Sequence, residues 1–149
     1  MSKFFPSKLS LIVLVSACSV ILISMGLRQT FGLFFDAFEK GLGVTRTEFG
    51  LAIGIQMLFW GFFAPIFGLL ADKFGGNKAV FLGFLIFALG IFMLYSGPNT
   101  GIYFQLALGV LVGTALGATA IGVPVSEVGK HFPNETRTIA TGVVTAAAS

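Results

Sequence analysis

The sequence predicts an all-α integral membrane protein, and two observations support this class. First, 56% of its 149 residues are hydrophobic and only 10% are charged, which leaves too little polar surface for a soluble domain of this size. Second, the apolar residues gather in long runs, and a spanning helix needs ~20 mainly apolar residues. We expect four complete transmembrane helices and the start of a fifth, at about residues 9–35, 49–71, 79–95, 102–128 and 139–149.

The first apolar run is expected to end in an acidic, glycine-punctuated loop at residues 36–43. After this loop, Thr45 or Thr47 followed by Glu48 supplies a helix start, with a polar cap and an acid near the positive end of the helix dipole. The second spanning helix should therefore begin close to this point.

The first run also has an alternative interpretation. Lys3 and Lys8 precede it, and the segment ending at Cys18 looks like the processing box of a bacterial lipoprotein. A cleaved signal needs an apolar region that stops near the cleavage site, but this one continues to Ile23 and beyond. We therefore favour an uncleaved spanning helix. The single cysteine excludes an internal disulfide.

The third and fourth runs differ in composition. Residues 79–95 contain no charged, Asn or Gln residue and are rich in Phe, so this helix can face lipid on most sides. In the fourth run Gly109, Gly113 and Gly117 recur every four residues on one face, and such small residues allow close helix contact. We expect the fourth helix to lie in the interior.

Two prolines, Pro65 and Pro124, fall inside the predicted helices, where each removes a backbone hydrogen bond and is expected to kink its helix. The last run, 139–149, is about half a bilayer long at 1.5 Å per residue. We expect it to be the start of a fifth helix in a longer protein.

Lysine and arginine counts predict the topology. With the N-terminus inside, two basic residues lie in outer segments, Lys40 and Arg46, and the inner segments carry six: Lys3, Lys8, Lys73, Lys78, Lys130 and Arg137. We expect a multi-pass protein of the cell (inner) membrane with a cytoplasmic N-terminus. The formal net charge is +3, but the basic residues form no patch, so we expect no nucleic-acid partner.

A short polar turn joins the second and third runs. Its spacing resembles the loop between the second and third helices of the major facilitator superfamily of secondary transporters, G-x-L-x-D-[RK]-x-G-x-x-[RK]. Gly76 and Asn77 depart from it, because they stand where that family more often carries basic residues. The matching residues are Gly68, Leu70, Asp72, Lys73, Gly75 and Lys78.

The resemblance implies a conformational gating role for this motif, whose members include Gly68, Asp72, Lys73, Gly75 and Lys78. An acid at the inner end of the second helix could bind a helix N-terminus or a cation in the other half of the transporter and so hold one gated state. The glycine pair at 75–76 would allow a tight turn by tolerating positive φ. The alternative is a solvated loop that obeys the positive-inside rule.

Two further segments resemble the same superfamily. Arg137, Ala140 and Gly142 look like the R-x-x-A-x-G start of its fifth helix, and residues 26–35 are similar to the first helix of oxalate/formate and monocarboxylate transporter relatives. The chain would then form the N-terminal helical bundle of a major facilitator fold and would need the C-terminal half as a partner. Gly109 occupies the position nearest to a fourth-helix arginine of many proton-coupled members, which speaks against proton–drug antiport.

Arg28 is the only charged residue set inside an apolar run rather than at its end. A charge near the centre of a membrane helix costs at least ~2.5 kcal/mol by insertion scales, so it usually faces a partner or an aqueous cavity. The planar guanidinium matches a carboxylate in two parallel hydrogen bonds. We therefore predict that Arg28 helps to bind an organic anion, with Gln29 and Thr30 as neighbours. Alternatively, Arg28 snorkels to the headgroups.

Gln56 and Trp60 lie four residues apart on the second helix and share a face. They could line a solute cavity, with the amide forming hydrogen bonds and the indole stacking. Interhelical packing with one satisfied amide is the commoner role of such a pair, and we favour it. Weaker candidates of the same kind follow on the fourth helix, at Gln105, Thr114 and Thr119.

The sequence contains no phosphate-binding glycine loop, no nucleophile and base pair, and no cysteine cluster. We therefore expect no enzyme, no cofactor and no metal. The resemblance implies a secondary transporter of a small organic anion such as a monocarboxylate, working by alternating access with a coupling proton or counter-solute. The alternatives are another solute class (sugar, drug or nucleoside), a transporter-like receptor, or a membrane lipoprotein or scaffold.

Overall fold

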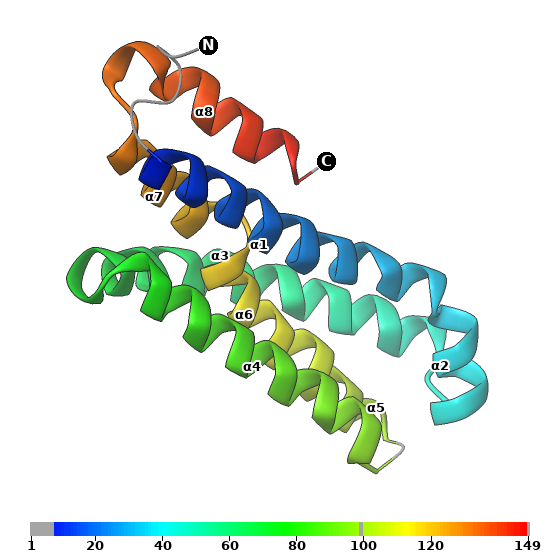
Figure 1. The fold of residues 1–149 in the computed structure, drawn as a ribbon. Helices are drawn as coiled ribbons and strands as arrows, with labels where there is room; N and C mark the ends of the chain where they lie inside the picture. The colour runs from blue at the N-terminus through cyan, green and yellow to red at the C-terminus, as the bar shows by residue number, and fades with distance from the viewer. Residues whose placement is uncertain (1–7, 99, 149) are drawn as a thin grey trace.

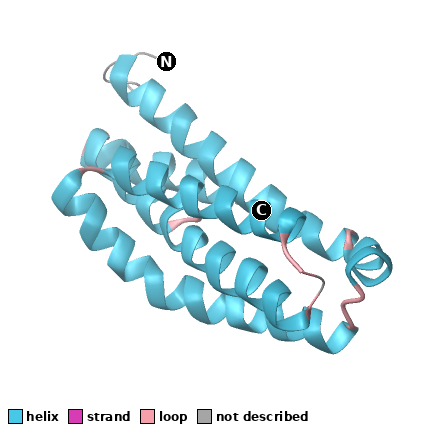
Figure 2. Cartoon of the chain, turned by 90° about the horizontal axis from the view of Figure 1, so that it is seen from below, coloured by secondary structure: helices cyan, strands magenta, loops and turns pink. Residues whose placement is uncertain are grey.

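The computed structural model describes residues 8–98 and 100–148, and every regular element in this part of the chain is helical (Figures 1 and 2). Four helical stretches are long and apolar enough to cross a membrane: Lys8–Leu33, Arg46–Phe74, Gly76–Ser96 and Gly101–His131. The predicted all-α class with four spans is confirmed. In chain order the elements are α1 (Lys8–Leu33), α2 (Phe35–Leu42), α3 (Arg46–Phe74), α4 (Gly76–Ser96), α5 (Gly101–Phe104), the π-helix η1 (Gln105–Leu111), α6 (Val112–Thr119), α7 (Gly122–His131) and α8 (Asn134–Ala146).

The four spans alternate in direction, so the bundle has two distinct ends. At one end the start of α1 meets the end of α7, where Ser10 Oγ donates a hydrogen bond of 3.0 Å to the carbonyl of His131. The α3–α4 turn lies at the same end, and we call it the Asp72 end. The opposite end carries α2 and α5 (Figure 1). There the ring centroids of Phe38 and Phe104 lie 5.3 Å apart. We call it the α2 end.

The fourth span forms the centre of the bundle. In its most apolar stretch 67% of the residues are buried, against 33%, 11% and 22% in α1, α3 and α4. Its α6 segment packs between α3 and α4, and its α7 segment packs on α1 and α8. The expected interior position of this helix is confirmed.

The glycine stripe of the fourth span explains this close packing. A Cβ at Gly113 would lie 2.7 Å from the carbonyl oxygen of Gln56, and one at Gly117 would lie 2.9 Å from the carbonyl carbon of Phe63. Both contacts are with the α3 backbone, which cannot move aside as a flexible side chain can. Only glycine therefore allows α3 to lie this close to the fourth span.

The segment predicted as a loop at residues 36–43 is instead largely helical, and this prediction was wrong. The first helix ends at Leu33, and α2 runs from Phe35 to Leu42 before Gly43 ends it with φ +67°, the left-handed conformation that favours glycine. Phe35, Phe38 and Leu42 follow a helical spacing that places them on one face. Two of these rings contact Phe49 of α3, at 5.2 Å and 6.4 Å between centroids.

The start of α3 agrees with the sequence pattern. Thr45 is the N-cap: its side chain accepts a hydrogen bond from the N–H of Glu48, and the Glu48 carboxylate accepts one from the N–H of Thr45 at 2.9 Å. This reciprocal capping box satisfies two backbone donors that a helix start leaves free. Of the two threonines considered, Thr45 is the cap.

The fourth span is interrupted at two places. α6 ends at Thr119 and α7 begins at Gly122, because Pro124 has no N–H to donate to the carbonyl four residues earlier. Ser24 of α1 donates from Oγ to the Thr119 carbonyl at 3.1 Å and so binds a carbonyl at this break. The second irregularity, η1, has no proline and was not predicted. Pro65, by contrast, lies within α3, which continues to Phe74.

Candidate functional site: a bridging arginine and a charged turn

The side chain of Arg28 crosses from α1 to α3. Its Nη2 lies 3.4 Å from Sδ of Met57, and its Cζ lies 5.4 Å from the ring centroid of Trp60. α1 packs mainly on α7 and α8 and makes few backbone contacts with α3. The Arg28 side chain therefore links two helices that otherwise contact each other little. A cation over an indole face is held by the ring quadrupole.

Arg28 has no anionic partner within residues 8–98 and 100–148. The ion pairs found there both involve Lys130, and Nε of Arg28 is buried without a hydrogen-bond partner. A buried donor left unpaired costs about 1–3 kcal/mol, and more if charged. The guanidinium therefore retains the capacity to bind a planar anion.

The direction of the side chain bears on the snorkelling alternative. Met57 and Trp60 follow Arg46, the first residue of α3, by 11 and 14 residues, about 16 and 21 Å along the axis at 1.5 Å per residue. Arg28 itself stands five residues before the end of α1 at Leu33. Its guanidinium thus contacts the middle of α3, whereas a snorkelling side chain would turn to the near end.

The other predicted solute residues of α1 are not gathered with Arg28. Gln29 is exposed, and Thr30 is half-buried. The Thr30 hydroxyl donates to the carbonyl of Leu27 in its own helix at 2.7 Å. Successive helical residues differ by about 100° in direction, so three neighbours cannot share one face.

Gln56 is completely buried. Its Nε2 donates to the carbonyl of Leu108 in η1 at 3.3 Å, whereas its Oε1 has no partner in the described part of the chain. This is the packing arrangement that the sequence favoured, with one satisfied amide between helices. On the fourth span Thr119 is also buried and donates to Ala115 at 3.1 Å, whereas Gln105 and Thr114 are half-buried.

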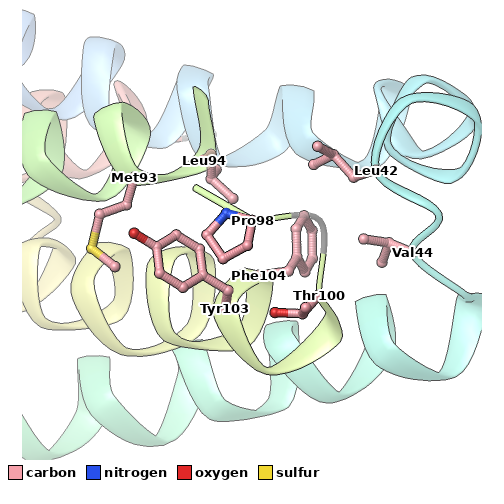
Figure 3. A pocket seen from close by; sticks show the side chains of 8 residues that line it. All are labelled: Leu42, Val44, Met93, Leu94, Pro98, Thr100, Tyr103 and Phe104. Atoms are coloured by element: carbon pink, nitrogen blue, oxygen red, sulfur yellow. The ribbon is translucent and has the colours of Figure 1, made fainter. Parts of the chain in front are cut away.

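Two cavities of the bundle are lined by residues other than the predicted solute residues. The first, of about 10 Å³, lies between the loops of the α2 end, where Tyr103, Pro98 and Phe104 converge (Figure 3). It holds roughly one water at most. The second is a groove of about 460 Å³ between α1, α4 and α7, with mainly apolar walls and with Asn77, Glu127 and His131 among its lining residues. Arg28 and Trp60 thus lie outside both cavities.

At the Asp72 end a charged cluster joins α3 to α7. Nζ of Lys130 lies 2.9 Å from a carboxylate oxygen of Asp72 and 2.9 Å from one of Glu127. Asp72 stands near the C-terminus of α3, where the helix dipole disfavours an acid, so the lysine offsets an unfavourable position. The Asp72 side chain is 64% exposed, and it remains open to solvent on its other side.

Glycine stands at the positions of this turn for different physical reasons. Gly75 has φ +94°, as the prediction of a tight turn requires. Gly76 does not share this conformation, so the prediction for it was wrong: it is buried, and a Cβ there would overlap the Glu127 side chain. A Cβ at Gly68 would meet nothing within 4 Å. Lys73 and Lys78 are exposed, with Nζ of Lys73 5.2 Å from the Phe74 ring centroid.

A comparison with protein families shows to which family the chain belongs. The family model named Major Facilitator Superfamily matches residues 17–149, which takes in all the helices described above except the start of α1. The chain belongs to the Major Facilitator Superfamily.

Two curated relatives of this superfamily chain are named as transport proteins. It is 33% identical over 85 residues to the "Putative metabolite transport protein YwtG" of Bacillus subtilis (strain 168), a match covering 56% of the chain and 17% of the relative. It is 32% identical over 90 residues to the "Riboflavin transporter RibZ" of Clostridioides difficile (strain 630), covering 56% and 18%. The matches span less than a fifth of either relative. No solved structure matches significantly.

The family model and the names of both relatives concern transport proteins. Of the three residues that resemble the superfamily's fifth-helix start, Ala140 is fully buried, whereas Arg137 and Gly142 are exposed. α8 begins at Asn134, five residues before the predicted start. At Gly109, the position that we compared with the fourth-helix arginine of many proton-coupled members, a Cβ would lie 2.9 Å from Cγ2 of Ile55, so the close approach of α3 leaves no room for a long side chain.

Sequence reasoning missed three residues of these clusters. Met57 contacts Arg28, but a methionine in an apolar helix gives no signal of such a role. Lys130 was considered only in the topology count, and Glu127 was not singled out. Their spacing of three residues on a helix was the one available signal that they interact. The contact of Lys130 with Asp72 joins positions 58 residues apart.

Proposed function

We propose that the protein containing this chain is a secondary active transporter of a small organic anion such as a monocarboxylate, working by alternating access. One observation carries the proposal: Arg28 extends from α1 to the middle of α3, contacts Met57 and Trp60, and has no carboxylate partner among the described residues. An unpaired intramembrane charge is expensive and marks a solute or ion pathway.

In this proposal Arg28 binds the carboxylate through its fork of donors, and Trp60 forms one wall of the site. Gln29, Thr30 and Gln56, the other candidates for solute binding, take supporting positions: Thr30 and Gln56 donate to backbone carbonyls. Because Arg28 and Trp60 lie outside both cavities of this bundle, the second half of the transporter would close the site. Energy would come from a coupling proton or a counter-solute, since no nucleotide-binding loop is present.

The turn at the Asp72 end would serve as the conformational gate. Gly68, Asp72, Lys73, Gly75 and Lys78 carry the motif, and the ion pair from Asp72 to Lys130 ties α3 to the fourth span. This tie would keep the spans of the N-terminal bundle moving as one body against its partner half. Arg137, Ala140 and Gly142 would form the start of the fifth helix in that bundle.

The basic residues support a topology in the cell (inner) membrane with the Asp72 end in the cytoplasm. The cations at or near this end outnumber the two near the α2 end, Lys40 and Arg46. Under the positive-inside rule, the N-terminus is then cytoplasmic. The cations of the Asp72 end that the structure describes are Lys8, Lys73, Lys78, Lys130 and Arg137.

A second candidate solute class is a planar heteroaromatic molecule. The riboflavin transporter of Clostridioides difficile is a relative, and the indole of Trp60 beside Arg28 offers a stacking surface for a ring system. Under this alternative the ring would stack on Trp60, and the arginine would bind a polar edge of the solute rather than a carboxylate.

The test is uptake by the full-length protein in proteoliposomes. We expect Arg28→Ala to abolish uptake of radiolabelled lactate or oxalate, while the protein still inserts into the membrane. Arg46→Ala is the matched control, because Arg46 also lies over a ring, that of Phe35 at 5.6 Å, but at the α2 end. Uptake unchanged by Arg28→Ala would refute the anion site. Uptake of riboflavin with no uptake of either carboxylate would establish the second solute class instead.

A further inference from the structure

The fourth span contains a wide turn whose backbone hydrogen bonds do not follow the α-helical spacing. In η1 these bonds span five residues rather than four. The N–H of Val112, where α6 begins, donates to the carbonyls of Ala107, five residues back, and Gly109. Neither bond uses the carbonyl of Leu108.

The return to α-helical spacing explains why Leu108 is passed over. Within α6 an N–H pairs with the carbonyl four residues back, so Gly113, the next donor, corresponds to Gly109. The change from a five-residue to a four-residue spacing thus leaves one carbonyl without a partner in its own helix. By this count that carbonyl belongs to Leu108.

Gln56 of α3 supplies the missing donor. Its Nε2 lies 3.3 Å from the Leu108 oxygen, and its side chain is completely buried. An unpaired carbonyl in a membrane interior is strongly disfavoured. Because Nε2 must face this acceptor, the amide orientation is fixed. Its Oε1 then has no partner among the described residues, so donation to Leu108 is the one polar interaction that this buried amide makes there.

We propose that Gln56 is a positioning residue that holds the fourth span in its π register. The wide turn contains one residue more than a continuous α-helix would have over the same length. Closing it would rotate the segment before the turn by about 100° relative to α6. In the segment of this span that precedes the wide turn, Gln56 therefore determines which side chains face the bundle.

The side chains before the wide turn show which residues the π register buries and which it exposes. Phe104 is buried against Phe38 and Phe49, with ring centroids 5.3 Å and 6.1 Å away. Ile102 and Leu106 point outward, with exposed fractions of 73% and 46%. A rotation of about 100° would withdraw Phe104 from this aromatic cluster. Met57, which contacts Arg28, directly follows Gln56 in α3. The hydrogen bond from Gln56 to Leu108, which we call the register lock, therefore lies next to the contact with Arg28.

A residue deletion tests this inference independently of transport. Removing Val110, a half-buried residue of the wide turn, would convert the turn into a continuous α-helix without rotating the segments on either side, and would leave no carbonyl for Gln56 to bind. The readout is cross-linking of Phe38→Cys to Phe104→Cys by a short thiol-reactive linker in the full-length protein, with Cys18→Ser as background.

We expect Gln56→Leu to reduce the cross-linked product several-fold, and the additional deletion of Val110 to restore it. The deletion alone should lower thermal stability, since it leaves both ends of the Gln56 amide unpaired. Gln105→Leu is the control, because this glutamine is half-buried in the same span, and it should change nothing. Should Gln56→Leu alone fail to fold, recovery of folding by the deletion supports the register lock equally well.

Two results would overturn the inference. One is normal cross-linking in Gln56→Leu, which would mean that the register holds without the amide. The other is that deletion of Val110 has the same effect whether residue 56 is glutamine or leucine. This includes the case in which the deletion variant and the double variant both fail to fold. Either result reduces Gln56 to an ordinary buried amide.

Discussion

Asp72 and Lys130 are joined by an ion pair of 2.9 Å that links the end of α3 to the end of the fourth span, 58 residues further along the chain. The same lysine also contacts Glu127 at 2.9 Å. Both partners are substantially exposed, at 64% for Asp72 and 44% for Lys130, so the pair contributes little to stability. In the proposed gate, this pair at the motif turn would act on the movement between conformations rather than on folding.

Neutralising the acid should therefore affect rate more than folding. We expect Asp72→Asn to change the free energy of unfolding by less than about 1 kcal/mol, as for an exposed pair, but to lower the maximal uptake rate several-fold with little change in KM. Glu39→Gln, an exposed acid on α2, is the control. An unaltered uptake rate in Asp72→Asn would remove the gating role.

Ser24 should stabilise the bundle through the break in the fourth span. It is fully buried, and its Oγ lies 3.1 Å from the Thr119 carbonyl as well as 2.8 Å from the Val20 carbonyl of its own helix. We expect Ser24→Ala to cost roughly 0.5–1.5 kcal/mol, measured as a lower midpoint of thermal unfolding in detergent. Ser19→Ala is matched, because Ser19 donates to Val15 within its own helix, and it should leave the midpoint unchanged. Equal effects of both substitutions would contradict the proposed tie.

Gly113 should tolerate no side chain. A Cβ there would stand 2.7 Å from the carbonyl oxygen and 2.9 Å from Cα of Gln56, and forcing α3 away by overpacking typically costs about 1–3 kcal/mol. We expect Gly113→Ala to lower the unfolding midpoint clearly. At Gly54, on α3, a Cβ would meet nothing within 4 Å, so Gly54→Ala should be harmless. Stability of Gly113→Ala equal to that of Gly54→Ala would argue against the close helix contact.

The capping box at the start of α3 gives a fourth prediction. Thr45→Ala removes the side-chain acceptor of the Glu48 N–H and should cost about 0.5–2 kcal/mol, read as faster amide hydrogen exchange in the first turn of α3. Thr47→Ala, at an exposed position inside the helix, is the control and should exchange as the parent protein does. Protection that survives Thr45→Ala would show that packing rather than the cap holds this end.

Several features followed from local pattern alone. The four spans were predictable because a run of about 20 apolar residues is long enough to cross the hydrocarbon core in any arrangement. The glycine stripe and a threonine cap at Thr45 or Thr47 were predictable because each depends on short spacings within one helix. α2 was missed because its acids and glycines resemble a loop, although Phe35, Phe38 and Leu42 hold a helical spacing.

The candidate site was predictable only in part. The sequence singled out Arg28 because a charge inside an apolar run is unusual, and it paired Gln56 with Trp60 because four residues make one helical turn. It could not decide that Arg28 approaches Trp60 while Gln56 faces Leu108, since that depends on how α3 is rotated between its neighbours.

The sequence by itself therefore determined that this is a membrane-spanning helical chain with a major facilitator motif, because composition, run length and spacing are properties of neighbouring residues. Only the tertiary structure decided that Asp72 pairs with Lys130, that Arg28 crosses to α3, and that the fourth span widens where Gln56 binds it. These relationships join residues 29 to 58 positions apart. They depend on the packing and rotation of whole helices, which local sequence patterns do not specify.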